Sequence, residues 1–246
     1  MRKVRTRTCG RLLGAAIVVA MAGAAAPPAA MAQDLTLHSK TAMPGRPSGT
    51  STIYFGQNAM KQTSSDGHGV IVRLDQQKMI LIDDGRKTYS EMTFEQAQQA
   101  GNRAMRGLDP QAAEQMRKMM GGDSPATVTD EGPGGQIAGY TTEKYELSMG
   151  PIQTEIWAAP EITVPGAYYE AMKALAPANP MIDMSKMYDE MKKVKGVALK
   201  TVMHMNMMGR DMAVTTEVTS IDKGPVPPST FDIPEGYKKV PAPMVG

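Results

Sequence analysis

Side chains with possible chemical roles are concentrated in residues 201–218, TVMHMNMMGRDMAVTTEV, which contain five methionines and one histidine. Thioether sulfur is a soft ligand that suits Cu(I), and imidazole is a common copper ligand. The same sulfur is also a flexible apolar filler in protein cores. The segment therefore predicts either a metal site or an apolar wall, and the choice depends on how the chain positions these side chains.

The alternation within this segment predicts two antiparallel strands joined by a turn at Gly209 and Arg210. In that register His204 lies on one side of the ribbon and most methionines lie on the other, so one ion cannot bind both. Alternate methionines suit Cu(I) and would equally form an apolar wall. The metal alternative uses Met203, Met205, Met207 and Met212. The expected pairs are Met207 with Met212, Met205 with Val214, Met203 with Thr216, and Thr201 with Val218.

Most of the remaining chain consists of closely spaced segments in which polar and apolar residues alternate, a pattern typical of antiparallel strands. Polar turns such as Asp84–Gly85 separate these segments. The closing residues 223–243 are too rich in proline for a central strand. Strands are expected at 49–56, 58–65, 69–75, 78–84, 86–92, 126–130, 139–148 and 152–159, and within 197–221.

Two segments change to the helical period. The first, about residues 94–120, follows a capping box of Thr93 and Gln96 and contains a second helix start at Asp109–Pro110. The second, about residues 165–195, contains an amphipathic stretch. On one face of that stretch lie Met184, Met187 and Met191. The sequence therefore predicts an α+β fold, with one large antiparallel sheet and two helical inserts that cover one face of it.

The N-terminal segment, residues 1–32, has the pattern of a secretory signal peptide. Five basic residues precede an uncharged run from Leu12 to Ala26, and a proline pair and small residues follow. We expect cleavage between Ala32 and Gln33. The run is too rich in alanine and glycine, and too soon interrupted by proline, to predict a membrane anchor.

Export leaves a single predicted domain over residues 33–242, with no transmembrane segment in the mature chain. The only cysteine, Cys9, precedes the apolar run instead of following it. Acylation at a lipoprotein cleavage site is therefore not expected, and the mature chain has no disulfide. We expect a periplasmic or secreted protein that is not a lipoprotein.

Charge and motifs narrow the possible functions. Removing residues 1–32 leaves 22 Lys and Arg against 25 Asp and Glu, a net charge of −3, which does not indicate a nucleic-acid partner. The chain lacks a G-x-S-x-G elbow, an H-E-x-x-H helix and a P-loop. Asp83 and Asp84 are more typical of a hairpin turn than of a catalytic carboxylate pair. The sequence thus predicts no enzymatic activity, no catalytic residue and no cofactor.

Four stretches resemble a bacterial family known as domain of unknown function 4412. They are MILIDDGRKTYSEM, IAGYTTEKYEL, TEIWAAPEITVPG and EVTSIDKGPVPPSTFDIPEGYKKV. This family is similar to the periplasmic lipoprotein carriers and receptors LolA and LolB. The resemblance implies a half-barrel, in which a curved antiparallel sheet and a lid of helices enclose an apolar cleft for acyl chains. The chain has no recognisable motif for a lipoprotein partner and no cysteine for a LolB-type lipid anchor.

We expect a non-enzymatic protein that binds a hydrophobic small molecule or an acyl chain between sheet and helices. Flexible methionines can repack around ligands of differing shape. The alternatives are a methionine-rich copper-binding protein and a passive envelope scaffold protein with a filled core. The expected cleft is lined by Leu199, Met203, Met205, Met207, Met212 and Val214 from the ribbon, and by Met184, Met187 and Met191 from the helix.

Overall fold

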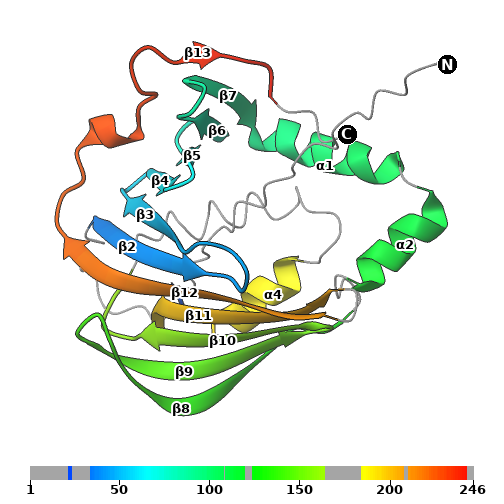
Figure 1. Ribbon diagram of the computed structural model, residues 1–246, viewed down its shortest axis with the longest axis vertical. Coiled ribbons are helices and arrows are strands. Elements are labelled where there is room, and N and C mark those ends of the chain that lie inside the picture. The colour runs from blue at the N-terminus through cyan, green and yellow to red at the C-terminus, as the bar shows by residue number, and fades with distance from the viewer. Residues whose placement is uncertain are drawn as a thin grey trace.

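The fold comes from a computed structural model, which describes residues 22–23, 34–107, 109–119, 124–163, 184–207 and 210–242. Within these residues the strands form one curved, open, 13-stranded sheet (Figure 1). Its order is β13-β7-β6-β5-β4-β3-β2-β12-β11-β10-β9-β8, with β1 paired to β11 beside this path. The pairs are antiparallel except β13 with β7. The strands are β1 (Ala22–Gly23), β2 (Leu35–Ala42), β3 (Gly49–Phe55), β4 (Ala59–Ser64), β5 (His68–Arg73), β6 (Lys78–Asp83), β7 (Thr88–Thr93), β8 (Thr127–Ile137), β9 (Tyr140–Met149), β10 (Ile152–Ala159), β11 (Gly196–Met207), β12 (Arg210–Lys223) and β13 (Lys238–Lys239).

Strand β2 joins the two halves of the sheet, because it pairs with β3 on one side and with β12 on the other. Sequence analysis did not predict this strand. Its alternation was available as a signal: Leu35 and Leu37 are buried, whereas Thr36 and His38, at the alternate positions, are partly exposed. The sequence predicted one large sheet without this strand, so it did not show how the two halves of the sheet connect.

The helical caps follow the predicted chemistry. Helix α1 (Phe94–Arg106) begins with a capping box, in which the Thr93 amide donates to Gln96 Oε1 at 2.9 Å and the Gln96 amide donates to Thr93 Oγ1 at 3.1 Å. Helix α2 (Pro110–Met119) begins where the Gln111 amide donates to Asp109 Oδ1 at 2.9 Å. These local sequence signals therefore placed both helix starts correctly.

Helix α4 (Met184–Met191) lies inside the curve of the sheet (Figure 1). It ends at Met191 and turns follow from Lys192, whereas the predicted insert extended to about residue 195. The part of the second insert over residues 164–183 lies outside the described residues. Of the two inserts expected to cover the concave face, α4 packs against it, and the covering role of α1 and α2 stays a prediction.

Three clusters of buried side chains hold the fold together. The central cluster joins β2, β3, β11 and β12 and includes Phe55 and Leu199. The second lies between α4 and the concave side of β9–β11, and includes Met187 and Met191. The third lies between β4–β6 and the C-terminal segment (residues 224–240), which carries the 3-10 helix η2 (Pro228–Phe231) along the outside of the sheet (Figure 1).

Two glycines allow close approaches that these clusters need. Gly196 begins β11 with φ of +84°, and a Cβ at this position would lie 1.8 Å from the carbonyl oxygen of Ala159. A Cβ at Gly56 would lie 2.9 Å from the ring of Phe231. Larger residues would therefore separate β10 from β11 at the first position and displace the C-terminal segment at the second.

Candidate binding site on the concave face

The final hairpin keeps the predicted faces but not the predicted register. Met203 pairs with Val214 instead of Thr216, so the second strand is shifted by two residues. The observed pairing of Met207 with Arg210 leaves two residues between the strands, as the predicted turn does, so the turn signal alone does not distinguish the two registers. A shift of two residues leaves every side chain on its predicted face, whereas a shift of one would have exchanged the faces.

Met203 and His204 lie on opposite faces, as predicted. His204 Nε2 lies 3.4 Å from Glu155 Oε2, and Glu155 also bonds Lys144 at 2.6 Å. Met203 of β11 pairs with Thr154 of β10, which is buried on the concave side. Within the described residues, no three His, Cys, Asp or Glu side chains are grouped as metal ligands. The Cu(I) alternative, which uses methionines, stays a prediction.

The predicted cleft residues fall into two groups. Leu199, Met187 and Met191 are buried in the packed clusters, with exposures of 1%, 7% and 6%. Met203 is 37% exposed, and Met212 and Val214 are partly exposed. The structure describes no side chain for Met184, Met205 or Met207. Only the exposed members are therefore available to a ligand without movement of a packed core.

A second apolar surface, not predicted from the sequence, lies on the concave side of β4–β7. The cross-strand row of Met60, Val72, Met79 and Met92 crosses these four strands, and Val70 pairs with Leu81 beside it. Five members of these rows are partly exposed, and we call them together the concave β4–β7 surface: Met60, Val70, Met79, Leu81 and Met92.

Alternation explains why sequence analysis missed this surface. Ile71, Ile80 and Ile82 occupy the intervening positions of β5 and β6 and are buried under the C-terminal segment. These strands are thus apolar on both faces. A nearly continuous apolar run does not show which face remains accessible. The available signal was the run itself, KMILID, in which apolar residues occupy consecutive positions.

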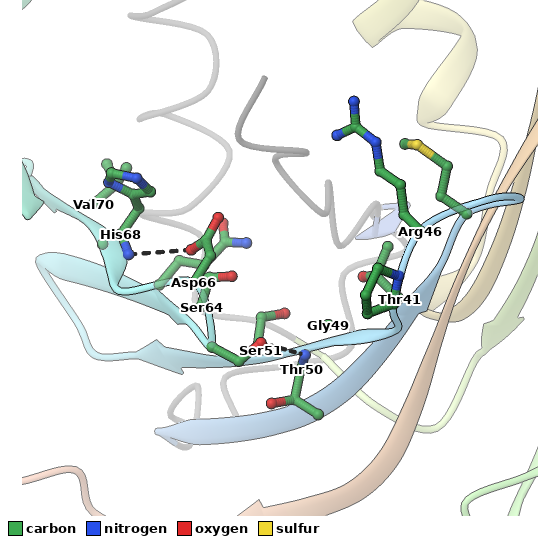
Figure 2. Close-up of a pocket in the computed structure, with 14 residues that line it drawn as sticks. Thr41, Arg46, Gly49, Thr50, Ser51, Ser64, Asp66, His68 and Val70 are labelled. Atoms are coloured by element: carbon green, nitrogen blue, oxygen red, sulfur yellow. Dashed lines mark hydrogen bonds between the residues drawn. The ribbon is translucent and has the colours of Figure 1, made fainter. Parts of the chain in front are cut away.

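A hollow of about 240 Å³ adjoins this surface where the β2–β3 loop faces the β4–β5 turn (Figure 2). Ser51, Gln62 and Ser64 come from neighbouring strands, and Val70 links the hollow to the concave β4–β7 surface. The hollow thus carries several polar groups beside an apolar surface, although apolar atoms form the larger part of its own lining. Its lining is completed by Thr41, Met43, Arg46, Pro47, Gly49, Thr50, Ser65, Asp66, His68 and Gly69.

Hydrogen bonds hold the two sides of the hollow together. The Ser65 amide donates to the Thr50 carbonyl at 2.8 Å, and the Thr50 amide donates to Ser65 Oγ at 3.0 Å. At the β4–β5 turn, the His68 amide donates to Asp66 Oδ1 at 3.1 Å (Figure 2). These bonds tie the start of β3 to the end of β4 and order the β4–β5 turn.

The convex face carries two polar arrangements. Trp157 lies between Lys144 and Lys200, whose Nζ atoms are 5.1 and 5.2 Å from its ring centroid. The ring also packs closely over Gly134, since a Cβ at that glycine would lie 2.7 Å from Trp157 Cδ1. The tryptophan thus supports a cation–π stack on the outer surface of the sheet.

The second arrangement joins β2, β3 and β12. His38 Nδ1 lies 3.1 Å from Thr52 Oγ1, and His38 Nε2 lies 3.1 Å from Asp222 Oδ2. This order of groups resembles a nucleophile–base–acid triad. The Asp222 side chain is 73% exposed, however, whereas a catalytic carboxylate that orients an imidazole is buried. We interpret the trio as a cross-strand hydrogen-bond network.

Comparison with known proteins establishes the family. The model of a domain of unknown function, DUF4412, matches residues 36–237. The chain belongs to the DUF4412 family. A comparison with curated proteins found no match. No helix among the described residues of this DUF4412 protein is both long enough and apolar enough to cross a membrane.

Solved structures show distant likenesses to the DUF4412 protein. An uncharacterised conserved protein from Thermus thermophilus has a TM-score of 0.49 and 7% identity, covering 86% of this chain and 92% of its own. A LolA superfamily protein from Nitrosomonas europaea has a TM-score of 0.31 and 7% identity, covering 82% and 90%. PNGF-II has a TM-score of 0.42 and 12% identity over 86% of this chain, which spans only 31% of PNGF-II.

Proposed function

We propose that the DUF4412 protein binds a hydrophobic ligand such as an acyl chain on its concave face. One observation carries this proposal. The concave β4–β7 surface leaves three methionines, a valine and a leucine partly exposed, although the opposite face of the same strands is sealed by the C-terminal segment. Partly exposed apolar residues gathered in one concave place are typical of a ligand site.

The chemistry of this surface suits a chain better than a rigid ligand. Met60, Met79 and Met92 are unbranched and flexible, so they can adapt to chains of different length. Covering such a chain would contribute about 0.8 kcal/mol for each buried CH₂ group. The hydroxyl, amide and charged groups of the hollow at one end of the surface would contact the ligand's polar end.

The fluorescent fatty acid cis-parinaric acid provides a direct test. We expect saturable binding of one probe per chain and an increase in its fluorescence. The Met79→Glu variant should weaken binding about tenfold or more, since it places a carboxylate against the hydrocarbon. The matched control is Val202→Glu, which makes the same kind of change at a partly exposed apolar residue on the convex face, where Val202 pairs with Glu155 and Thr215.

Circular dichroism and urea unfolding of both variants separate a lost site from a lost fold. Equal weakening by Met79→Glu and Val202→Glu would contradict the concave site. A complete lack of saturable binding by the natural chain would remove the proposal.

We also propose that the chain is exported and cleaved between Ala32 and Gln33. The signal-like composition of residues 1–32 supports this. Cleavage would remove β1, which pairs with Gly196 and Val197 of β11, and would leave β2 intact. Sequencing the N-terminus of the purified protein tests the site, and an N-terminus at Met1 would contradict it.

A further inference from the structure

The charges at the hollow suggest which polar group the ligand carries. Arg46 is exposed on the β2–β3 loop, and Asp66 is exposed on the β4–β5 turn. Figure 2 shows their side chains on opposite sides of the hollow. Neither forms an ion pair with any residue that the structure describes. Two opposite charges therefore face one chamber without neutralising each other.

Uncharged polar groups also line the hollow. Ser51, Ser64 and Thr41 carry hydroxyl groups, and Gln62 carries a side-chain amide. Hydroxyl and amide groups can both donate and accept hydrogen bonds, so they accommodate either sign of charge. These uncharged groups therefore favour neither an anion nor a cation. Arg46 adds a preference for an anion on one side of the hollow, and Asp66 adds a preference for a cation on the other.

The position of the hollow connects this polar chemistry to the apolar surface. Val70 belongs to the lining of the hollow and pairs with Leu81 on the concave β4–β7 surface. A molecule that occupies both places needs a compact polar group attached to a hydrocarbon chain. The polar group must carry one positive and one negative charge to complement Asp66 and Arg46.

We propose that the ligand is an amphiphile with a zwitterionic headgroup, bound with its anionic group near Arg46, its cationic group near Asp66 and its chain on the concave β4–β7 surface. This inference rests on the proposed function. The guanidinium can bind the anionic oxygens of a headgroup in a bidentate manner. The Asp66 carboxylate retains an oxygen for the cation while Oδ1 accepts from the His68 amide.

Calorimetric titration with amphiphiles of one chain length tests the inference. The probes, kept below their micelle concentrations, are dodecylphosphocholine (zwitterionic), dodecyl maltoside (uncharged), dodecyl phosphate (anionic) and dodecyltrimethylammonium (cationic). We expect dodecylphosphocholine to bind about tenfold more tightly than dodecyl maltoside, because charge-assisted contacts exceed neutral ones. Glycerophosphocholine, which has no hydrocarbon chain, should bind far more weakly than dodecylphosphocholine.

Variants should shift the preference in opposite directions. Arg46→Glu leaves two acidic groups at the hollow, so it should favour dodecyltrimethylammonium. Asp66→Asn keeps a side-chain oxygen for the His68 amide but removes the charge, so it should favour dodecyl phosphate. The control is Arg86→Glu on the β6–β7 turn. Arg86 forms an ion pair with Asp83 and does not line the hollow. It should leave the order of the four probes unchanged.

The outcomes separate this inference from the proposed function. Equal binding of all four amphiphiles, unchanged by Arg46→Glu, would overturn the zwitterionic headgroup and leave chain binding on the concave face intact. Binding of none of them would overturn both. Equally tight binding of glycerophosphocholine and dodecylphosphocholine would overturn the role of the chain, since the hollow alone would then recognise a free zwitterion.

Discussion

The two ends of the sheet are sealed on opposite faces. At the β9–β11 end, the concave face is covered by α4, and the convex face carries solvated charges around Trp157. At the β4–β7 end, the convex face is covered by the C-terminal segment, and the concave face carries partly exposed methionines. Similar strands thus contribute a closed core at one end and an accessible apolar surface at the other.

This difference shows that methionine content alone does not identify a ligand site. Met187 and Met191 of α4 belong to a packed core, where flexible side chains fill the space between helix and sheet. Met79 and Met92 lie on the concave β4–β7 surface and remain partly exposed. The candidate site is the part of the sheet whose apolar face is only partly covered by other segments.

The cover of the convex face should give the largest mutational effect. Phe231 is 7% exposed and packs with Ile71 and Ile80. We expect Phe231→Ala to lower the free energy of unfolding by about 3–5 kcal/mol, because it removes the main aromatic contact between η2 and the sheet. Urea unfolding measures this change. A loss under about 1 kcal/mol would mean that the C-terminal segment does not seal this face.

The next largest effects on stability should distinguish the methionines at the two ends of the sheet. Met191→Ala in α4 is expected to cost about 2–3 kcal/mol, because it leaves a cavity in a packed cluster. Met79→Ala should cost about 1 kcal/mol or less, because its side chain is already partly in contact with water. Unfolding both variants in urea compares them directly. Equal losses would remove the distinction between a closed and an accessible end.

The smallest effect should come from the edge of the β4–β7 end. The pKa of the Glu91 carboxyl lies below its ordinary value, because Lys239 of β13 and then Lys78 of β6 donate hydrogen bonds to it. A carboxyl whose pKa is lowered on folding stabilises the protein above its ordinary pKa of about 4.3, and this contribution is lost as the pH falls through the lower folded value.

We therefore expect Glu91→Gln to cost about 0.5–1 kcal/mol at pH 7, and little once the pH falls well below 4. Urea unfolding of both chains across this pH range measures the difference. Asp189→Asn, at an exposed pair on α4, is the control and should have almost no effect. A Glu91 difference that persists at low pH would show a packing effect instead of an electrostatic one.

Local patterns predicted most of the sheet and the helix starts. The meander of 49–92, the capping box at Thr93 and the final hairpin are confirmed. The hairpin register was wrong by two residues, since its loop signal fits two positions. The hollow was not predicted, because its walls come from a loop and a turn whose residues carry no recognised motif.

By itself, the sequence determined where strands alternate, where helices begin and which family the chain resembles, because these properties depend on neighbouring residues. Only the tertiary structure decided which face of each strand is covered. Residues 224–240 reach the convex side of strands more than a hundred positions earlier, and α4 reaches the concave side of β9–β11. A strand that is apolar on both faces is compatible with either cover, so long-range packing made the choice.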